Sequence, residues 1–416
     1  MNPLGSFTTL GDDVARSWEA SNCTLDAFAE IATETLQRSG VLESTSLRDI
    51  TDWFISSNEL PPQSLVDFGQ PPVRVYDGRG FYIELLFWVD TPTAIHQHSF
   101  SGAFGVLRGS SFHSQYRFER VHTISDELAT GSLQLLSTEL LQRGDVRPIV
   151  AGDAFIHSLL HLEPPSISVV VRTGVQRPFG PQMSYDMPGL AYDPFYREQP
   201  LLTQIALLKT LLRSEPELFR ELAMQIVSER DIFFAYKVID TVSRQVGDCE
   251  ILNELLRVLA LRDAGFTAVL EAALREERRT ASIRALLKDV TNAEQRFLLA
   301  LLITAPNRSV VDAMMRKRFP AHDPETKILE LIAEMTANKK FVNFDKLTLR
   351  LFQFAIRGAS FDDVEDAFHR RFGEGHEALE TVRVQWLRLH AESPFSPMLG
   401  GAHAGQRRPR PVTTPA

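Results

Sequence analysis

The stretch that decides the fold reads FYIELLFWV over residues 81–89, followed by AIHQHSFSGAFGVLRG over residues 94–109. Residues 81–89 are rich in aromatic and aliphatic side chains and follow the turn sequence DGRG at 77–80, which predicts a hairpin and a long β-strand. Within residues 94–109 a single residue separates His96 from His98. Alternation along a strand places both imidazoles on the same face. Two imidazoles at this spacing can hold one metal ion from one side.

Further strands are predicted downstream of this stretch. They cover residues 94–107, 111–119, 146–150, 153–157 and 166–173, with Gly and Pro at the breaks. The last of them, SISVVVRT, is rich in β-branched residues and is expected to be buried. Several short strands at this spacing are typical of a sandwich or barrel, which we place at residues 69–190.

The region before the barrel reads as helical. Residues 1–68 carry apolar side chains at helical spacing, namely Leu25, Phe28, Ile31, Ala32 and Leu36. Pro61 and Pro62 then break the pattern. We expect these helices to pack on the barrel.

The region after the barrel, residues 200–392, predicts an all-α domain of amphipathic helices joined by short links. Three helix starts are expected: Ser214 with Glu217, Asp323 before Pro324, and Ser360 with Asp363. A HEAT-like array is one interpretation and an irregular helical domain is the other, because no repeat of fixed length is visible. Residues 393–416 contain several Pro and Gly and few large apolar residues, so we expect a disordered tail.

Composition excludes several classes of function. The chain has 416 residues, is 44% hydrophobic and carries a net charge of −9. Lys and Arg are scattered among more numerous carboxylates, which disfavours nucleic-acid binding. The two cysteines, far apart, form no disulfide framework or Cys-type zinc site. Without a signal sequence or a long apolar run, a soluble cytoplasmic protein with no membrane contact is expected.

Histidines concentrate in the predicted barrel. Six of the eleven lie there, at positions 96, 98, 113, 122, 157 and 161. A third imidazole from another strand would complete a site with open coordination positions, and such a site suggests catalysis rather than structure. We therefore expect His96 and His98 to bind a divalent metal together with a third histidine of this region.

Two motifs carry a family resemblance. His98 is followed by Gly102 and Gly109 at a spacing that resembles the first cupin motif, and PIVAGDAFIHSLLH at 148–161 resembles the second. The resemblance covers roughly residues 70–180 and implies a cupin barrel, a double-stranded β-helix or jelly roll. The Glu of the first motif is absent, since Gly102 or Ala103 stands there. The Asn of the second motif is replaced by His161.

A cupin without that Glu keeps three histidines, so the resemblance implies a divalent metal on His96, His98 and His157. This three-histidine pattern resembles the thiol dioxygenases such as cysteine dioxygenase. Trp88, eight residues before the first histidine, and the Glu163-Pro164 segment fit that branch. Arg74 matches its substrate-carboxylate arginine, although the hairpin spacing is shorter. The crosslinking cysteine at 102–103 and the Ser-His-Tyr set after residue 166 are missing. The resemblance therefore implies Fe²⁺ and O₂ as cofactor and co-substrate, and leaves the substrate open.

Other residues have competing interpretations. His161 shares a strand face with His157, so it orients a ligand, packs in the core or serves as a fourth ligand. Glu84 and Asp153 are further candidates for orienting a ligand imidazole. Side chains that could bind a substrate carboxylate are Arg74, Arg108 and Arg172, the last being costly to bury without an anionic partner. Positions expected to be ordinary polar or core residues are His113, His122 and Tyr116.

Three functions remain open. The first is an Fe²⁺-dependent, O₂-dependent cupin oxygenase acting on a small thiol or amino-acid-type substrate, which a larger partner could carry. The second is a non-redox cupin that uses another divalent metal as a Lewis acid, as an isomerase, lyase or hydrolase. The third is a ligand-sensing cupin whose helical domain binds a protein or peptide. The three-histidine pattern favours the first.

Overall fold

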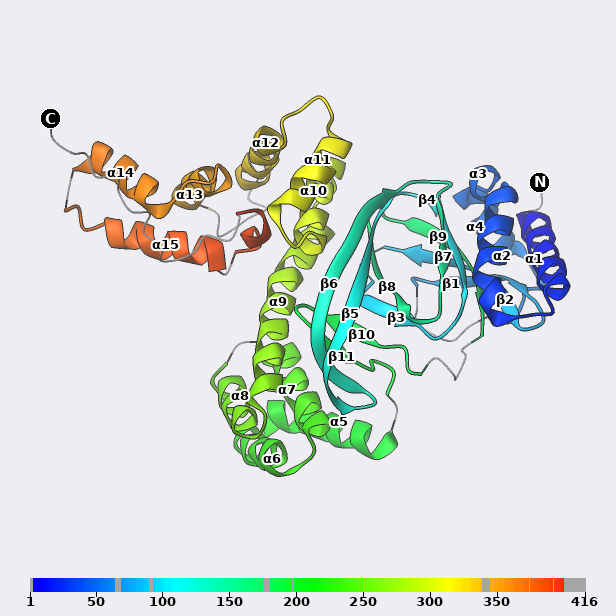
Figure 1. Cartoon of the computed structure of the whole chain (residues 1–416), viewed down its shortest axis with the longest axis horizontal. Coiled ribbons are helices and arrows are strands. Elements are labelled where there is room, and N and C mark those ends of the chain that lie inside the picture. The colour runs from blue at the N-terminus through cyan, green and yellow to red at the C-terminus, as the bar shows by residue number, and fades with distance from the viewer. Residues whose placement is uncertain are drawn as a thin grey trace. The chain divides into compact units, whose positions relative to one another are not determined.

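The computed structural model describes residues 3–63, 69–89, 93–174, 180–196, 198–247, 249–338, 345–373, 375–391 and 393–399. A β region follows the first helices and consists of two antiparallel sheets (Figure 1). The first sheet has the strand order β1(Pro72–Asp77), β2(Phe81–Trp88), β9(Ser166–Thr173), β4(Gly102–Arg108) and β7(Val146–Ile149).

The second sheet closes into a barrel. Its order is β10(Ser184–Asp186), β11(Leu190–Tyr192), β6(Leu128–Leu141), β5(Ser111–Ser125), β8(Gly152–His161) and β3(Ile95–His98). The long hairpin of β5 and β6 forms one side, and β8 pairs with both β5 and β3. This pairing brings β8 beside the short strand that carries the paired histidines.

Four N-terminal helices cover one face of the first sheet: α1(Pro3–Ala20), α2(Leu25–Arg38), α3(Val41–Ser44) and α4(Leu47–Ser56). Phe28 and Leu36 of α2 share a buried cluster with Ile83 and Val171 of the sheet. The other face of the sheet carries a separate apolar cluster that includes Phe104. Because the strands alternate, the helices bury one face and leave the other to line the interior of the β region.

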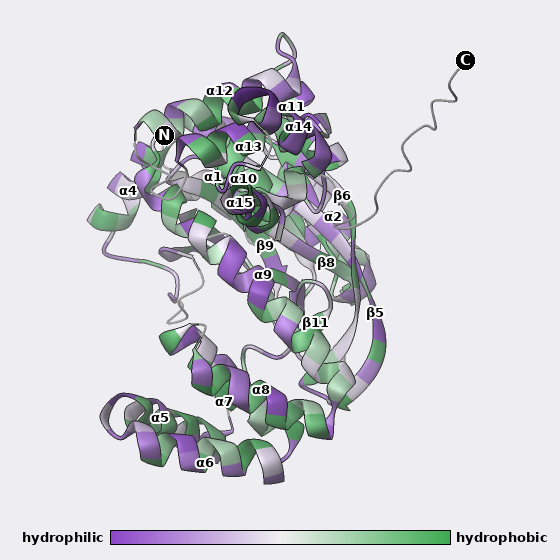
Figure 2. Cartoon of the chain, turned by 90° about the vertical axis from the view of Figure 1, so that its left-hand side faces the viewer, coloured by the Kyte–Doolittle hydropathy of each residue, from purple (hydrophilic) through white to green (hydrophobic). Residues whose placement is uncertain are grey.

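Five helices follow the barrel: α5(Gln199–Ser214), α6(Pro216–Glu229), α7(Ile232–Val246), α8(Glu250–Arg262) and α9(Ala264–Asp289). Figure 2 shows hydrophilic and hydrophobic residues mixed along α6, α8 and α9, as expected of helices that bury one face. Their core includes Leu128 and Leu190 of the barrel. The chain divides into two compact units between Arg278 and Arg279, within α9.

The second unit is helical. It contains the rest of α9, then α10(Ala293–Thr304), α11(Arg308–Arg318), α12(Pro324–Ala337), α13(Lys346–Ile356), α14(Phe361–Phe372), α15(Leu379–Ala391) and the 3₁₀ helix η2(Ser396–Met398). Residues 393–399, assigned to the tail by the sequence, thus carry ordered structure and bury Phe395. The rest of the predicted tail, 400–416, lies outside the described residues.

The observed strands differ from the predicted ones in several places, and the short strands β10 and β11 were not predicted. The predicted strand 94–107 is two strands, β3 and β4, separated by residues 99–101. Strand β6 was not predicted, because Ser, Thr and Gly interrupt its leucines and its outer half is exposed. The segments 81–89 and 166–173 are confirmed as β2 and β9.

Two of the three predicted helix starts are confirmed. Asp323 accepts a hydrogen bond from the Thr326 amide, and Ser360 forms a reciprocal capping box with Asp363. The Ser214 prediction is wrong, since Ser214 is the last residue of α5. Proline at position 216 begins the next helix two residues later, where its missing amide hydrogen costs nothing.

The predicted architecture, a β barrel followed by an all-α region, is confirmed. No helix in the described ranges is both long enough and apolar enough to cross a membrane.

Candidate metal centre

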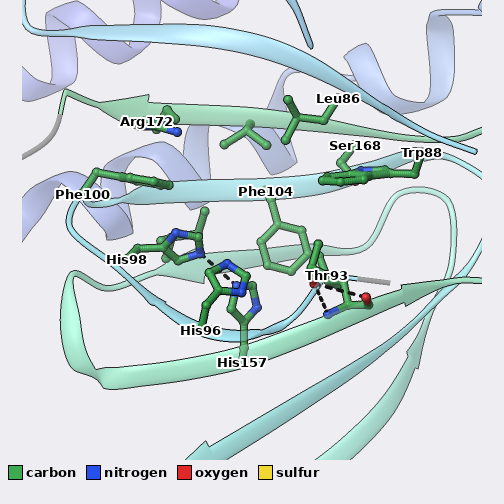
Figure 3. A pocket seen from close by; sticks show the side chains of 13 residues that line it. Leu86, Trp88, Thr93, His96, His98, Phe100, Phe104, His157, Ser168 and Arg172 are labelled. Atoms are coloured by element: carbon green, nitrogen blue, oxygen red, sulfur yellow. Dashed lines mark hydrogen bonds between the residues drawn. The ribbon is translucent and has the colours of Figure 1, made fainter. Parts of the chain in front are cut away.

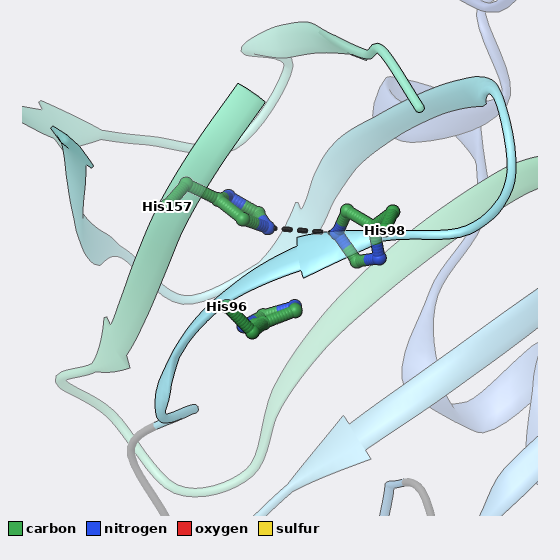
Figure 4. Close-up of side chains that lie close together, drawn as sticks. All are labelled: His96, His98 and His157. Carbon is green, nitrogen blue, oxygen red and sulfur yellow. Dashed lines mark hydrogen bonds between the residues drawn. The ribbon is translucent and has the colours of Figure 1, made fainter. Parts of the chain in front are cut away.

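Two paired strands bring the three predicted ligands together. His96 and His98 extend from the same face of β3, and His96 lies directly opposite His157 of β8. Figure 4 shows the three rings turned toward one another. All three side chains are buried, with at most 5% of their surface exposed. Gln97 points to the other face, where its side chain contacts Tyr185 and the Pro181 carbonyl.

The ring nitrogens are spaced as metal ligands are. The Nε2 atoms of His98 and His157 lie 2.9 Å apart. One ligand nitrogen from each of the three rings lies within 4.8 Å of the other two. Two imidazoles bound at right angles to a metal, with bonds of about 2.1 Å, would place their nitrogens about 3.0 Å apart. The histidines therefore fit a single divalent ion.

The hydrogen bonds of His96 fix its ring. Its Nδ1 atom lies 2.7 Å from the Ala94 carbonyl oxygen, which can only accept, so Nδ1 carries the proton. The Nε2 atom of His96 and the Nδ1 atom of His98 are buried without a partner in the described residues. A buried, unpaired nitrogen is costly unless a ligand completes it. The unpaired Nε2 atom of His96 is a second indication of a bound ion. Nδ1 of His98 is not, because the 2.9 Å spacing assigns the Nε2 atom of that ring to the ion.

The electrostatics favour neutral imidazoles. Burial is the main cause that lowers the pKa of His96, His98 and His157 below the ordinary histidine value. Neutral imidazole is the form that binds metals.

His157 is supported by a chain of three further side chains. Its Nδ1 atom lies 3.2 Å from Nε2 of His113, whose Nδ1 atom lies 2.9 Å from a carboxylate oxygen of Glu139. Arg147 donates two hydrogen bonds to that carboxylate, of 2.9 and 2.6 Å. These bonds lower the pKa of Glu139 to about 2, so it stays ionised. The expectation that His113 is an ordinary polar residue is wrong, because it is fully buried against a candidate ligand.

A small cavity of about 40 Å³ opens beside the three histidines. That volume holds roughly three waters. Its remaining described lining residues are mostly apolar and none is Asp or Glu: Leu86, Trp88, Thr93, Phe100, Phe104, Ile149, Leu159, Ser168, Val170 and Arg172 (Figure 3).

Arg172 is the charged residue of this lining. Its guanidinium carbon lies 3.5 Å from the centre of the Phe100 ring and 5.2 Å from that of Tyr82. Figure 3 shows Phe100 between Arg172 and His98. No carboxylate of the described residues lies within 4.0 Å of Arg172, and its Nε atom is buried without a partner there. Burial lowers the pKa of its guanidinium, which indicates the cost of keeping this charge inside.

Arg74, the predicted substrate-binding arginine, has other partners. It forms ion pairs with Glu84 at 3.2 Å and Asp77 at 3.3 Å, and its guanidinium lies over Tyr82. It does not line the cavity. The pairing of β1 with β2 places Arg74 opposite Glu84, and that buried carboxylate holds it. Arg172, on β9, lines the cavity in its place.

His161 lies outside the cluster of candidate ligands. Its Nδ1 atom is 2.8 Å from the Ser111 hydroxyl, and its ring stacks on Trp88 with centres 4.8 Å apart. Burial lowers its pKa to about 3. It does not line the cavity, so the packing interpretation fits it better than a catalytic role.

The other residues that the sequence suggested lie outside the cluster of three histidines. Asp153 lines a separate hollow beside Tyr185, and Arg108 is exposed. His122 is exposed, 3.7 Å from Asp263, as expected of an ordinary polar residue. Tyr116 is confirmed as a core residue.

The position of the missing Glu has a structural explanation. A Cβ atom at Gly102 would meet the backbone of β9, and Ala103 points into the cluster under the N-terminal helices. Neither position offers a fourth ligand. No local sequence pattern indicates the contact of His113 with Glu139 and Arg147, because that contact depends on the pairing of β5 with β6.

Comparisons with known proteins add little. No protein-family model matches the sequence, and no curated protein matches it. A solved structure described as "Crystal structures of DMSP lyases RdDddP and RnDddQII" is 12% identical and covers 42% of this chain and 96% of its own, with a TM-score of 0.23. A likeness at that score carries no argument about this chain.

Proposed function

We propose that this protein is a non-haem iron oxygenase that uses Fe²⁺ on His96, His98 and His157 to act on a small anionic substrate of the thiol or amino-acid class. The observation that carries the proposal is the convergence of three buried imidazoles on one point beside a small, mostly apolar cavity. Imidazole ligands suit iron, zinc, copper and nickel, and three of them leave coordination positions open for catalysis.

The lack of Asp and Glu among the described lining residues supports an anionic substrate. Three neutral imidazoles leave a divalent ion its full charge, and Arg172 adds another positive charge to the same cavity. Ferrous iron bound there would supply the activation of O₂ once substrate is present. The chain itself would orient the substrate and keep water out through Phe104, Leu159 and Val170.

Arg172 is the residue we propose for binding the substrate. A guanidinium that is buried without a carboxylate partner is stabilised when it donates to a substrate carboxylate. Phe100 lies between this guanidinium and His98, so a substrate that spans both must contact the Phe100 ring. The cavity volume of about 40 Å³ favours a compact molecule.

The helices after residue 200 are absent from a minimal cupin barrel. We propose that they form a separate functional region that binds a protein or peptide, in keeping with a substrate carried on a larger partner. A helical repeat among them stays a prediction.

Metal analysis tests the proposal. Protein purified without oxygen should contain about one iron per chain and consume O₂ when given small thiols or amino acids. His96→Ala and His157→Ala should lose the metal, whereas His122→Ala, a change at an exposed histidine of the same β region, should keep it.

Three results would contradict the proposal. Variants that keep the metal would show that the ligand assignment is wrong. Zinc or manganese in place of iron, with no O₂ uptake, would instead favour a non-redox cupin enzyme. Metal-free native protein with a tightly bound small molecule or partner would favour a sensing role.

A further inference from the structure

The three candidate ligands are supported in three different ways. His96 donates to the backbone carbonyl of Ala94, and the second nitrogen of His98 has no partner in the described residues. The second nitrogen of His157 alone contacts another side chain, the fully buried His113. This difference makes His157 the ligand that the rest of the protein can influence most.

The donor and acceptor groups of this chain determine which nitrogen of each histidine carries the proton. The Glu139 carboxylate only accepts, so Nδ1 of His113 carries a proton and donates to it. Nε2 of a neutral His113 is then an acceptor, and Nδ1 of His157 donates to it. The remaining nitrogen of His157, Nε2, is left with a lone pair, and this is the atom 2.9 Å from His98. The opposite tautomer would present a proton at the metal position.

The strand pairing holds this chain of contacts in place. His113 lies directly opposite Glu139 in the pairing of β5 with β6, and β5 also pairs with β8, which carries His157 (Figure 1). Arg147 of β7 donates two hydrogen bonds to Glu139, so the carboxylate cannot rotate without breaking them. The aromatic rings of Phe104 and Phe155 pack against the His113 ring.

We infer that His113 and Glu139 are positioning residues that hold His157 in the metal-binding tautomer and strengthen its Nε2 atom as a donor. The inference rests on the proposed metal site. A carboxylate behind a ligand imidazole raises the basicity of that ligand, and here the effect passes through an additional imidazole. Neither residue lines the cavity, so neither is expected to touch the substrate.

Binding of Co²⁺ alone to the full chain tests the inference. Titration calorimetry should give an affinity about 10- to 100-fold weaker in His113→Phe and Glu139→Gln than in the wild type. The visible absorption bands of bound Co²⁺ should shift in both variants, because the donor strength of one ligand has changed. His113→Gln, which keeps an acceptor near His157 but cuts the link to Glu139, should bind between His113→Phe and the wild type.

The matched control is Gln134→Ala. It removes an exposed hydrogen bond from Arg117 across the same pair of strands and should leave affinity and spectrum unchanged. Should His113→Phe fail to fold, Glu139→Gln still gives the answer, since about a third of that side chain is exposed.

The outcomes separate the two proposals. Wild-type protein that binds no Co²⁺, or that binds it as well after His157→Ala, would overturn the metal site and this inference with it. Normal binding by the wild type, loss in His157→Ala, and an unchanged affinity and spectrum in Glu139→Gln and His113→Phe would overturn the inference alone.

Discussion

The backbone at Gly102 lies against the carbonyl oxygen of Val171 so closely that a Cβ atom at position 102 would be 2.1 Å from that oxygen. The same atom would be 2.9 Å from the α-carbon of Arg172. Both contacts are with backbone atoms of β9, which pairs with β4 along its length and cannot yield easily. The glycine is therefore required by the close packing of β4 against β9.

The first prediction concerns this contact. Gly102→Ala should lower the free energy of unfolding by roughly 1–3 kcal/mol, because the added methyl group must push two paired strands apart. Gly105→Ala on the same strand is the control, since its methyl group would meet only the flexible side chains of Leu36 and Leu42. Denaturant unfolding should show the larger loss for Gly102→Ala. Equal losses would mean that β9 gives way as readily as a side chain.

The second prediction contrasts two arginines. Arg74→Met should destabilise the fold by roughly 3 kcal/mol, because it leaves the buried carboxylate of Glu84 without its cation. Arg172→Met should cost less, since no carboxylate among the described residues depends on Arg172. Thermal or denaturant unfolding of the two variants provides the comparison. A larger loss for Arg172→Met would show that the guanidinium has a partner within the protein.

The third prediction concerns substrate binding. Once an anionic substrate has been identified, Arg172→Met should raise its KM at least about tenfold, because a charge-assisted bidentate contact is removed. The metal content should stay unchanged, since Arg172 is not among the ligands. Steady-state kinetics and metal analysis on the same preparation check both points. An unchanged KM would show that another residue binds the anionic group of the substrate.

The fourth prediction is a pH dependence. The folded protein resists protonation of His161, whose pKa falls to about 3, whereas the unfolded chain takes up the proton near the ordinary value of 6.5. The unfolded state thus binds more protons between pH 6.5 and 3, so His161 makes stability fall as the pH is lowered through that window.

His161→Phe keeps a ring against Trp88 but cannot titrate. Its stability relative to the wild type should therefore improve from about pH 7 to about pH 5, and the ligand histidines contribute equally to both proteins. Unfolding free energies at the two pH values give the difference. A difference that does not change with pH would show that the pKa of His161 is the same in the folded and the unfolded chain.

The fifth prediction is stabilisation by metal. A divalent ion at about 100 times its dissociation constant should raise the free energy of unfolding by about 2.7 kcal/mol if it binds only the folded chain. A chelator should reverse the effect, and His157→Ala should show none. Thermal melts with and without the ion measure it. Equal stabilisation of the variant would indicate binding at another site.

The sequence was sufficient to identify the three candidate ligands. The alternation of side chains on a strand placed His96 and His98 on one face, and the resemblance of residues 148–161 to the second cupin motif indicated His157. Both arguments use information that lies within one segment of chain. The structure brings the three together because β3 and β8 pair.

The surroundings of the ligands were not predictable in the same way. Glu139 lies on β6, and the polar residues among the leucines of β6 give no clear strand pattern. The contact of Glu139 with His113 depends on the register of β5 and β6. The choice between Arg74 and Arg172 likewise depends on which strand pairs with Glu84. Such cross-strand relationships join residues far apart in the chain, and no local pattern records them.

The chain from His157 through His113 ends on two residues, Glu139 and Arg147, whose side chains are each about 30% exposed. The inner members are locked in the core, whereas the outer pair can be exchanged without disturbing the packing of the barrel. If the three histidines bind a metal as proposed, variation at positions 139 and 147 would adjust the reactivity of that metal with every ligand retained. Homologues with identical histidine triads need not be equivalent catalysts, and these two positions are where their differences should be sought first.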